Sequence, residues 1–460
     1  MRVVHITPWN VQCGIARHLS YWLADAIKRY RDVDHVILAE DPPVWQPQTG
    51  GYPNVPAIPC WRRATRGSCA DVLQKIIDHG PALVHYQYDP EFLPWPELRP
   101  MADALHARGI GLIVTIHCLH DLTSPATCAN KAVLEAADAV IVGTPHMDRA
   151  VREYVDRFHL PTRGRTRVIP LASPVFDTPP LPPRGGPTVL TFGFLGRHKG
   201  HAEVLDAVRI LRVNGRPMAR YEVMGAAITG EQRQVRDELA AVAAKEPDLV
   251  TLTETFAPCS DLERAFSRAS VIALNHNTPY ASSSGTVCLA LASGRPVVVS
   301  DMPMLVSGNE GAVVVARAGP AGWADAIDRA LRQDSTREDA QAAVRERIHP
   351  RRVAEEHLSL YRAVLSRGII PDPLGKSIDP LPPPPPPPAP VPKPKPPVAK
   401  PAPPTPPAPE PAPAVPAPAD TLTMACMRRA KAASAAGNIL AACAWILAAA
   451  DALDEEDKSR

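Results

Sequence analysis

Residues 282–301, "SSSGTVCLALASGRPVVVSD", contain a helix signal and a strand signal directly after one another. The Ala- and Leu-rich part predicts a helix from about 286 to 293, which Gly294 ends because glycine readily adopts the left-handed conformation of a helix C-terminus. The apolar run 296–299 then predicts a strand that is buried on both faces, which is typical of a parallel sheet. The stretch therefore indicates an α/β protein.

The start of that helix is a predicted anion site. The first backbone N–H groups of a helix have no partner within the helix, and they point toward its N-terminus. Here they belong to or follow Ser284, Gly285 and Thr286, whose small side chains leave room for a ligand.

The same alternation of strand and helix runs through most of the chain. It begins with "RVVHITP", "GIARHLSYWLADAIKRY" and "DHVILAE", breaks at the Pro- and Gly-rich stretch 173–187, and restarts at "TVLTFGFLG". Short apolar strands separated by amphipathic helices predict a parallel sheet covered on both faces. We therefore expect two Rossmann-like α/β domains in tandem, at 1–175 and 184–370, with a cleft between them.

The rest of the chain has a different composition. Of the 55 prolines, 25 lie between Pro371 and Pro418, so 371–420 is predicted to be a disordered Pro/Ala-rich linker. Residues 421–460 are Ala-rich. Their uncharged run 432–450 is long enough to raise the question of a membrane span, but Ala, Gly and Asn make it weakly apolar. We expect a short helical tail that packs on itself or on a partner protein.

Charge and cysteine content exclude some classes of protein. A formal net charge of +2 over 460 residues gives no global argument for nucleic-acid binding. The basic stretches 61–66 and 163–167 leave two interpretations open, a solvated loop or a contact with anionic lipid.

Nine cysteines without a CxxC pair indicate reduced, buried thiols. Because the sequence begins directly with a strand, we expect a cytoplasmic protein, with peripheral contact at the inner membrane face left open.

Several strand ends of the first domain carry candidate ligand-binding residues. A loop with Gly14 joins the first strand to a helix, so backbone amides are expected at the sheet edge where α/β proteins bind ligands. A tight turn explains Gly14 equally well. His117 directly follows the strand "GLIVTI", where a side chain faces a cleft rather than the core. The roles of Gln87, Asp89 and His120 stay open.

The second domain begins with a strand that runs into "GRHKG". Arg197 and Lys199 thus lie between two glycines at a strand end, where a guanidinium, an ammonium and unpaired amides are a good receptor for phosphate. A solvated basic turn is the alternative. We favour phosphate binding because the segment 282–286 supplies a second anion site in the same domain.

In their order and spacing these motifs resemble the family 4 glycosyltransferases of GT-B fold, over about 1–367. The resemblance rests on the Gly14 loop, the 282–301 stretch and the following segments: "HYQYDPEF", "TIHCLHD", "AADAVIVGTP", "VIPLASP", "FGFLGRHKG", "ASVIALN" and "LYRAVL". It implies a retaining enzyme. The second domain would hold a nucleotide-diphospho-sugar donor, and the first would hold a polysaccharide, glycolipid or glycoprotein acceptor.

Residue by residue, the resemblance implies that Arg197 and Lys199 hold the donor diphosphate together with Ser284–Thr286. Gly14 would lie close to the donor phosphate or the acceptor, and His117 near the transferred sugar. In such enzymes the leaving diphosphate oxygen is thought to deprotonate the acceptor hydroxyl, so that no enzymatic nucleophile is required. We expect no metal or other cofactor, because the sequence has no DxD-like pair at a strand end and Arg197 and Lys199 could supply the positive charge.

One departure from the family leaves two functions open. Many members carry two glutamates eight positions apart where this chain has Ala281 and Leu289, and the second commonly binds the nucleotide ribose. The protein is then either an active glycosyltransferase or a catalytically inactive, glycosyltransferase-like scaffold that binds partners through its linker and tail. The intact Arg197, Lys199 and His117 favour the enzyme.

Overall fold

The computed structural model describes residues 1–41, 43, 51–119, 124–162, 165–176, 179, 181, 185–277, 283–332 and 334–366. The predicted linker 371–420 and tail 421–460 lie outside these residues. So do Ala281 and His120.

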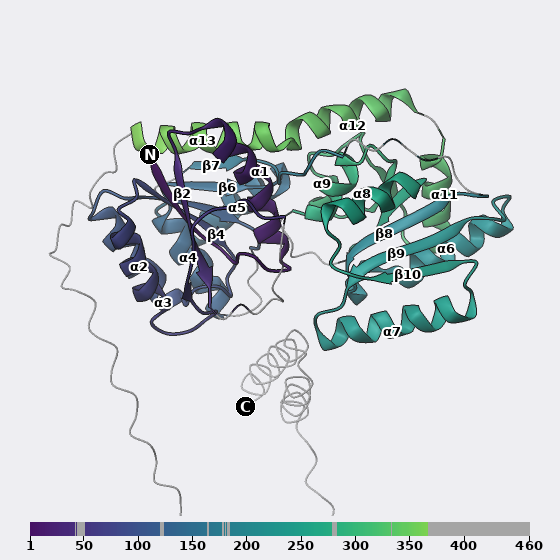
Figure 1. The fold of residues 1–460 in the computed structure, drawn as a ribbon, viewed down its shortest axis with the longest axis horizontal. Helices are drawn as coiled ribbons and strands as arrows, with labels where there is room; N and C mark the ends of the chain where they lie inside the picture. The colour runs from purple at the N-terminus through teal and green to yellow at the C-terminus, as the bar shows by residue number, and fades with distance from the viewer. Residues whose placement is uncertain are drawn as a thin grey trace, which may run out of the picture. The chain divides into compact units, whose positions relative to one another are not determined.

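The first lobe is built on a parallel sheet, for which the described residues give seven strands in the order β3-β2-β1-β4-β5-β6-β7 (Figure 1). The strands are β1 (Arg2–Ile6), β2 (Asp34–Glu40), β3 (Ala57–Trp61), β4 (Leu83–Tyr88), β5 (Gly111–Ile116), β6 (Ala139–Val142) and β7 (Arg165–Val168). The helices between them are α1 (Gly14–Arg29), α2 (Ser68–His79), α3 (Trp95–His106), α4 (Ser124–Ala136) and α5 (Pro145–Phe158).

The second lobe repeats this arrangement with six described strands in the order β10-β9-β8-β11-β12-β13. The strands are β8 (Thr188–Phe194), β9 (Arg220–Ala226), β10 (Val250–Glu254), β11 (Val271–Leu274), β12 (Val297–Ser300) and β13 (Val314–Ala316). The helical segments are the 3-10 turn η1 (Arg197–Lys199), α6 (His201–Val213), α7 (Gly230–Lys245), α8 (Cys259–Arg268), α9 (Gly285–Ala292), α10 (Pro303–Val306), α11 (Pro320–Ala330) and α12 (Ser335–Ile348).

Both sheets are covered on both faces, because their strands are apolar at successive positions. In β1, Val4 and Ile6 pack on one side with α2 to α5, whereas Val3 packs on the other side with α1. In β12, Val298 packs with α6, α7 and α11, while its neighbours Val297 and Val299 pack with α8, α9 and α12. The continuous apolar runs in the sequence thus become central parallel strands, as predicted.

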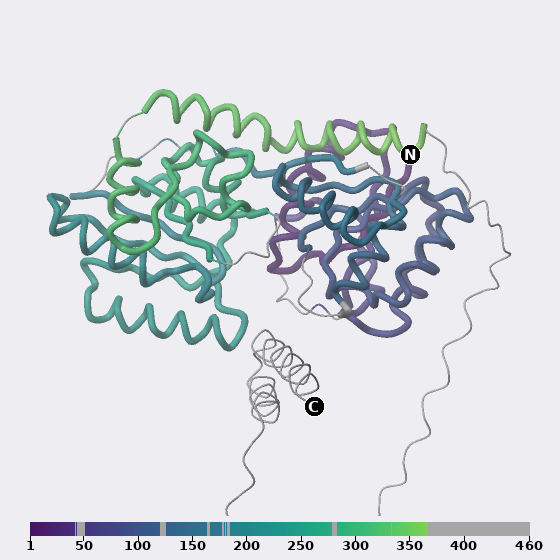
Figure 2. The backbone as a smooth tube through the Cα atoms, turned by 180° about the vertical axis from the view of Figure 1, so that it is seen from behind, coloured from purple at the N-terminus to yellow at the C-terminus, as the bar shows by residue number. Residues whose placement is uncertain are grey.

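The last described helix, α13 (Pro350–Ser366), follows the second lobe in sequence but packs on the first. Its buried residues Val353, Leu358 and Tyr361 join the apolar cluster around Trp22 of α1. Figures 1 and 2 show α13 running along the first lobe and α12 along the second. The predicted domain 184–370 included this helix because sequence continuity was the only guide to its place.

The two strand orders determine where a ligand can bind. In each sheet the order reverses next to its first strand, between β1 and β4 and between β8 and β11. Loops at the carboxyl ends of such strands leave the sheet in opposite directions, which opens a crevice for a ligand. The structure confirms the predicted fold class of two Rossmann-like α/β units.

Candidate active site

A cavity of about 300 Å³ lies at the carboxyl ends of the strands and is lined by residues of both lobes. The second lobe contributes residues that end or follow β8, β9, β10 and β11, and the first lobe contributes one face of α1. Five residues predicted from the sequence line this cavity, namely Gly14, Lys199, Ser284, Gly285 and Thr286. The described lining residues include no Asp or Glu.

The N-terminus of α9 opens into the cavity. Ser284 is its N-cap, and its Oγ accepts a hydrogen bond from the backbone N–H of Val287 at 3.4 Å. The hydroxyls of Ser284 and Thr286 lie 2.8 Å apart. Gly193 of β8 has a φ of +116°, and a Cβ there would lie 3.1 Å from Cγ2 of Thr286. Small residues on both elements therefore let the helix start approach the strand end closely.

Lys199 reaches the cavity from the turn η1. The turn ends at Gly200, which has a φ of +54° and lies so close to Asn275 that a Cβ would clash with its side chain. Lys199 Nζ lies 2.8 Å from Nε2 of His276, a buried residue that also lines the cavity. Burial lowers the pKa of Lys199 to about 7 and that of His276 to about 2. The ammonium donates to a neutral imidazole, and the described contacts of Lys199 include no carboxylate.

Arg197 points elsewhere. Its guanidinium Nη2 lies 2.7 Å from Oε1 of Glu238 on α7, with both side chains more than half exposed. Its backbone N–H donates to Glu231 at 2.7 Å. Arg197 is not among the described residues that line the cavity. The structure thus separates two cations that the sequence places two residues apart.

His117 lies beside the cavity rather than in its lining. Its ring centroid is 6.0 Å from that of His18, which does line the cavity. His117 Nε2 lies 2.7 Å from Oε1 of Gln87. Burial lowers the pKa of His117 to about 3, so its imidazole is neutral at physiological pH. The sequence left the roles of Gln87, Asp89 and His120 open, and the hydrogen bond with His117 gives Gln87 a place next to the cavity.

The contacts of Gln87 continue into the core of the first lobe. Its Nε2 lies 3.1 Å from Nε2 of His85, and Nδ1 of that histidine lies 2.6 Å from the hydroxyl of Tyr361 on α13. His85 Nε2 also lies 2.7 Å from the hydroxyl of Thr115. A buried hydrogen-bonded chain thus connects His117 to a helix about 240 residues further along the sequence.

Several lining residues were not found from the sequence. Arg17, His18 and Tyr21 follow Gly14 on α1, and Phe256 follows β10. The spacing 14, 17, 18 and 21 places the α1 residues on one helix face, which was the available signal. It was missed because the pattern also suits a helix face that packs on the sheet.

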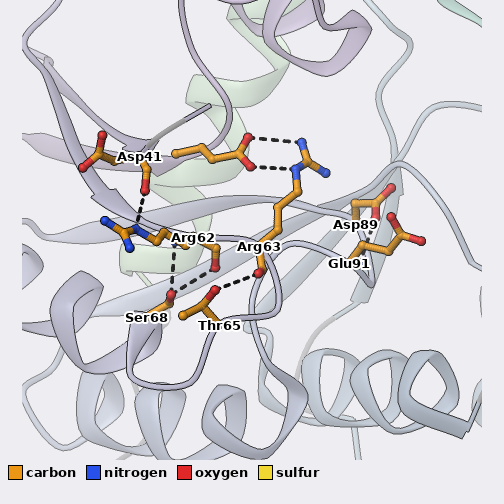
Figure 3. A network of polar contacts seen from close by, with 8 residues as sticks. Asp41, Arg62, Arg63, Thr65, Ser68, Asp89 and Glu91 are labelled. Carbon is orange, nitrogen blue, oxygen red and sulfur yellow. Dashed lines mark hydrogen bonds and ion pairs between the residues drawn. The ribbon is translucent and has the colours of Figure 1, made fainter. Parts of the chain in front are cut away.

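The basic stretch 61–66 is largely engaged with the chain itself (Figure 3). Arg63 Nε lies 2.7 Å from Oε1 of Glu40, whose side chain is 1% exposed. Arg62 Nε donates to the carbonyl oxygen of Asp41 at 2.8 Å, and Ser68 bonds the backbone of Arg62. These contacts favour a structured loop over a free cationic surface.

The described ranges contain no group of three or more His, Cys, Asp or Glu side chains that could hold a metal ion. None of their helices is both long and apolar enough to cross a membrane.

Comparison with known proteins places these features in a family. Residues 186–333 match the family described as glycosyl transferases group 1. A search of the curated proteins gave no match.

Three solved structures show the shared fold. Sucrose-phosphate synthase from Thermosynechococcus elongatus aligns with a TM-score of 0.57 at 19% identity, over 80% of this chain and 100% of that one. HepE of Anabaena, in complex with UDP-glucose, aligns with a TM-score of 0.58 at 15% identity, over 79% of this chain and 100% of that one. An α,α-trehalose-phosphate synthase from Burkholderia vietnamiensis aligns with a TM-score of 0.56 at 14% identity, over 80% and 98% of the two chains.

These likenesses cover both lobes, whereas the family match lies in the second lobe. That lobe contributes Lys199 of the η1 turn and the N-terminus of α9 to the cavity. The resemblance noted in the sequence is confirmed: residues 186–333 match the glycosyl transferases group 1 family, and the two lobes share the GT-B fold of these glycosyltransferases.

Proposed function

We propose that this glycosyltransferase binds the diphosphate of a nucleotide-sugar donor in the cavity and transfers the sugar, with retention of configuration, to an acceptor hydroxyl. The observation that carries the proposal is the convergence of Lys199 and the N-terminus of α9 on one cavity that Gly14 also lines. An ammonium, unpaired helix amides and hydroxyls all favour a bound anion. The absence of carboxylates among the described lining residues supports the same ligand class.

The residues have separate tasks in this proposal. Lys199, Ser284, Gly285 and Thr286 bind the diphosphate and stabilise the negative charge that develops as the bond to the sugar breaks. Gly14 lets the backbone of the first lobe approach the donor. His117, kept neutral by burial and oriented by Gln87, lies beside the transferred sugar. Arg197 joins the phosphate contacts only if it exchanges Glu238 for the ligand.

The acceptor proton leaves without an enzymatic base. The acceptor hydroxyl attacks the anomeric carbon on the face that the diphosphate leaves, and the departing phosphate oxygen takes its proton. The products are the glycosylated acceptor and a protonated nucleoside diphosphate. The protein contributes orientation and charge stabilisation rather than a covalent intermediate, and no metal is part of this scheme.

UDP is the first nucleotide to test, because HepE has been solved with UDP and with UDP-glucose. Calorimetric titration with UDP and GDP, followed by hydrolysis assays with a panel of nucleotide sugars, tests the proposal. We expect one nucleotide to bind and its sugar derivative to be hydrolysed slowly in the absence of acceptor. Binding of neither nucleotide would overturn the proposal.

One observation keeps a second function in view. Leu289, which stands where many family members have a ribose-binding glutamate, does line the cavity. An apolar side chain there cannot make the hydrogen bond that a glutamate would make to the nucleotide. Such a loss is expected in a catalytically inactive scaffold, whose linker and tail would recruit a partner. Nucleotide binding without any sugar hydrolysis or transfer would favour that function.

A further inference from the structure

We propose that Arg17 binds a phosphate group of the donor nucleotide, so that the first lobe supplies a cation to a site whose other cation, Lys199, comes from the second lobe. The inference rests on the proposed function, because it takes the cavity to be the donor site.

The position of Arg17 on α1 directs it to the cavity. Gly14, Arg17, His18 and Tyr21 all line the cavity, and their spacing of three, four and seven residues places them on one helix face. Gly14 is the first residue of this helix. The Arg17 side chain therefore starts one turn beyond a glycine that leaves the backbone open to a ligand.

Aromatic rings and one carbonyl hold the guanidinium of Arg17 in place. Its Cζ lies 5.9 Å from the ring centroid of Tyr21 and 5.5 Å from that of Phe256. One Nη donates to the carbonyl oxygen of Ala257 at 3.3 Å. The one described hydrogen bond uses a single N–H of a group that carries five, and the planar guanidinium can bind phosphate oxygens in pairs.

No acid among the described lining residues balances the charge of Arg17. Arg17 is 6% exposed, and its described ion pairs and hydrogen bonds include no carboxylate. The other cation in the lining is Lys199, and the described lining contains no Asp or Glu. A buried cation with one neutral acceptor is costly unless an anion completes its shell. Arg197, by contrast, is exposed and already paired with Glu238.

The test compares variants of the full-length protein by calorimetric titration with UDP, GDP, inorganic pyrophosphate and uridine. Arg17→Met removes the charge and keeps much of the side-chain length, and Arg17→Lys keeps the charge but loses the fork. Arg29→Met is the matched control, because Arg29 lies at the other end of α1 in an exposed ion pair with Asp25. Thermal unfolding of each variant shows whether it folds.

We expect Arg17→Met to lower the affinity for pyrophosphate, and for whichever nucleoside diphosphate binds the wild type, by about 10- to 100-fold. This is the scale of one charge-assisted contact. Arg17→Lys should recover part of that loss, and Arg29→Met should bind like the wild type. Uridine should bind all variants alike.

Two results overturn the inference. In the first, Arg17→Met lowers the melting temperature but leaves the affinity for diphosphates unchanged. Arg17 would then have a structural role, in which its hydrogen bond to Ala257 links the first lobe to the second. In the second, Arg17→Met weakens the binding of uridine as much as that of UDP, which assigns Arg17 to contact with the base or ribose. If the wild type binds neither UDP nor GDP, the proposed function itself fails.

Discussion

Lys199 Nζ lies 2.8 Å from Nε2 of His276, so the ammonium of the candidate phosphate site faces a neutral imidazole. Three histidines lie near it, and burial, followed by the charge of Lys199, lowers the pKa of each: His198, His201 and His276. Two acids of the neighbouring helices have other partners: Glu203 accepts a hydrogen bond from Asn275 at 2.6 Å, and Glu231 accepts one from the backbone N–H of Arg197 at 2.7 Å. A bound anion would therefore be the main partner that favours the charged lysine.

Nucleotide binding should be linked to proton uptake by Lys199. Burial lowers the pKa of Lys199 to about 7, and a bound diphosphate raises it because an anion favours the charged form. Below pH 7 the lysine is already charged. Above pH 7 binding takes up a proton, and affinity falls as pH rises, by up to about tenfold per unit. Titration with UDP or GDP at pH 8, in two buffers of different ionisation enthalpy, measures the uptake.

Lys199→Met is the control for this prediction. It should abolish the lysine-linked uptake and weaken nucleoside diphosphate binding by about 1.5 to 3 kcal/mol. Equal binding enthalpies in the two buffers for the wild type would contradict the prediction.

Gln87 should position His117. Gln87→Leu removes the acceptor of the 2.7 Å hydrogen bond from His117, so we expect kcat to fall about tenfold while nucleotide affinity stays the same. Gln87→Glu keeps an acceptor but adds a carboxylate, which raises the pKa of His117 from about 3. Its activity should therefore decline toward acidic pH as His117 becomes protonated, unlike that of the wild type. Identical pH profiles of kcat over pH 5 to 9 would argue against this role.

Ser284 should contribute to both stability and binding. Ser284→Ala removes the N-cap of α9 and should lower the free energy of unfolding by about 1 kcal/mol. It also removes a hydroxyl from the cavity, so nucleoside diphosphate affinity should fall. Ser335→Ala, at the exposed start of α12, is a comparison outside the site. Urea unfolding and calorimetry check the two effects, and unchanged affinity would remove Ser284 from the donor site.

The hydroxyl of Tyr361 should stabilise the first lobe. Tyr361→Phe leaves Nδ1 of His85 without its partner at 2.6 Å, and we expect a loss of about 1 to 2 kcal/mol in the free energy of unfolding. Tyr30→Phe is the control, since the described contacts give the Tyr30 hydroxyl no hydrogen bond. Equal stability of the two variants in urea would show that the buried contact contributes nothing.

Deletion of residues 371–460 should leave nucleoside diphosphate binding intact. The described residues that line the cavity all lie between Gly14 and Met304, and α13 ends at Ser366. Calorimetry on the truncated and full-length chains compares the two affinities. A truncated protein that folds but does not bind would assign the C-terminal region a part in the donor site.

Local pattern was enough to predict much of this protein. Apolar runs predicted strands such as β12, because a strand buried on both faces must be apolar at every position. Gly14 and the segment Ser284–Thr286 were found because a helix that begins at a strand end presents unpaired amides whatever it packs against.

What the sequence by itself determined is therefore the type and order of the elements and the helix starts that line the cavity, which depend on residues close together along the chain. The tertiary structure alone decided which side chains share a cavity. It paired Arg197 with Glu238, placed Arg17 and Lys199 in the lining of one cavity, and packed α13 on the first lobe. These outcomes depend on contacts between residues tens to hundreds of positions apart, which no local spacing encodes.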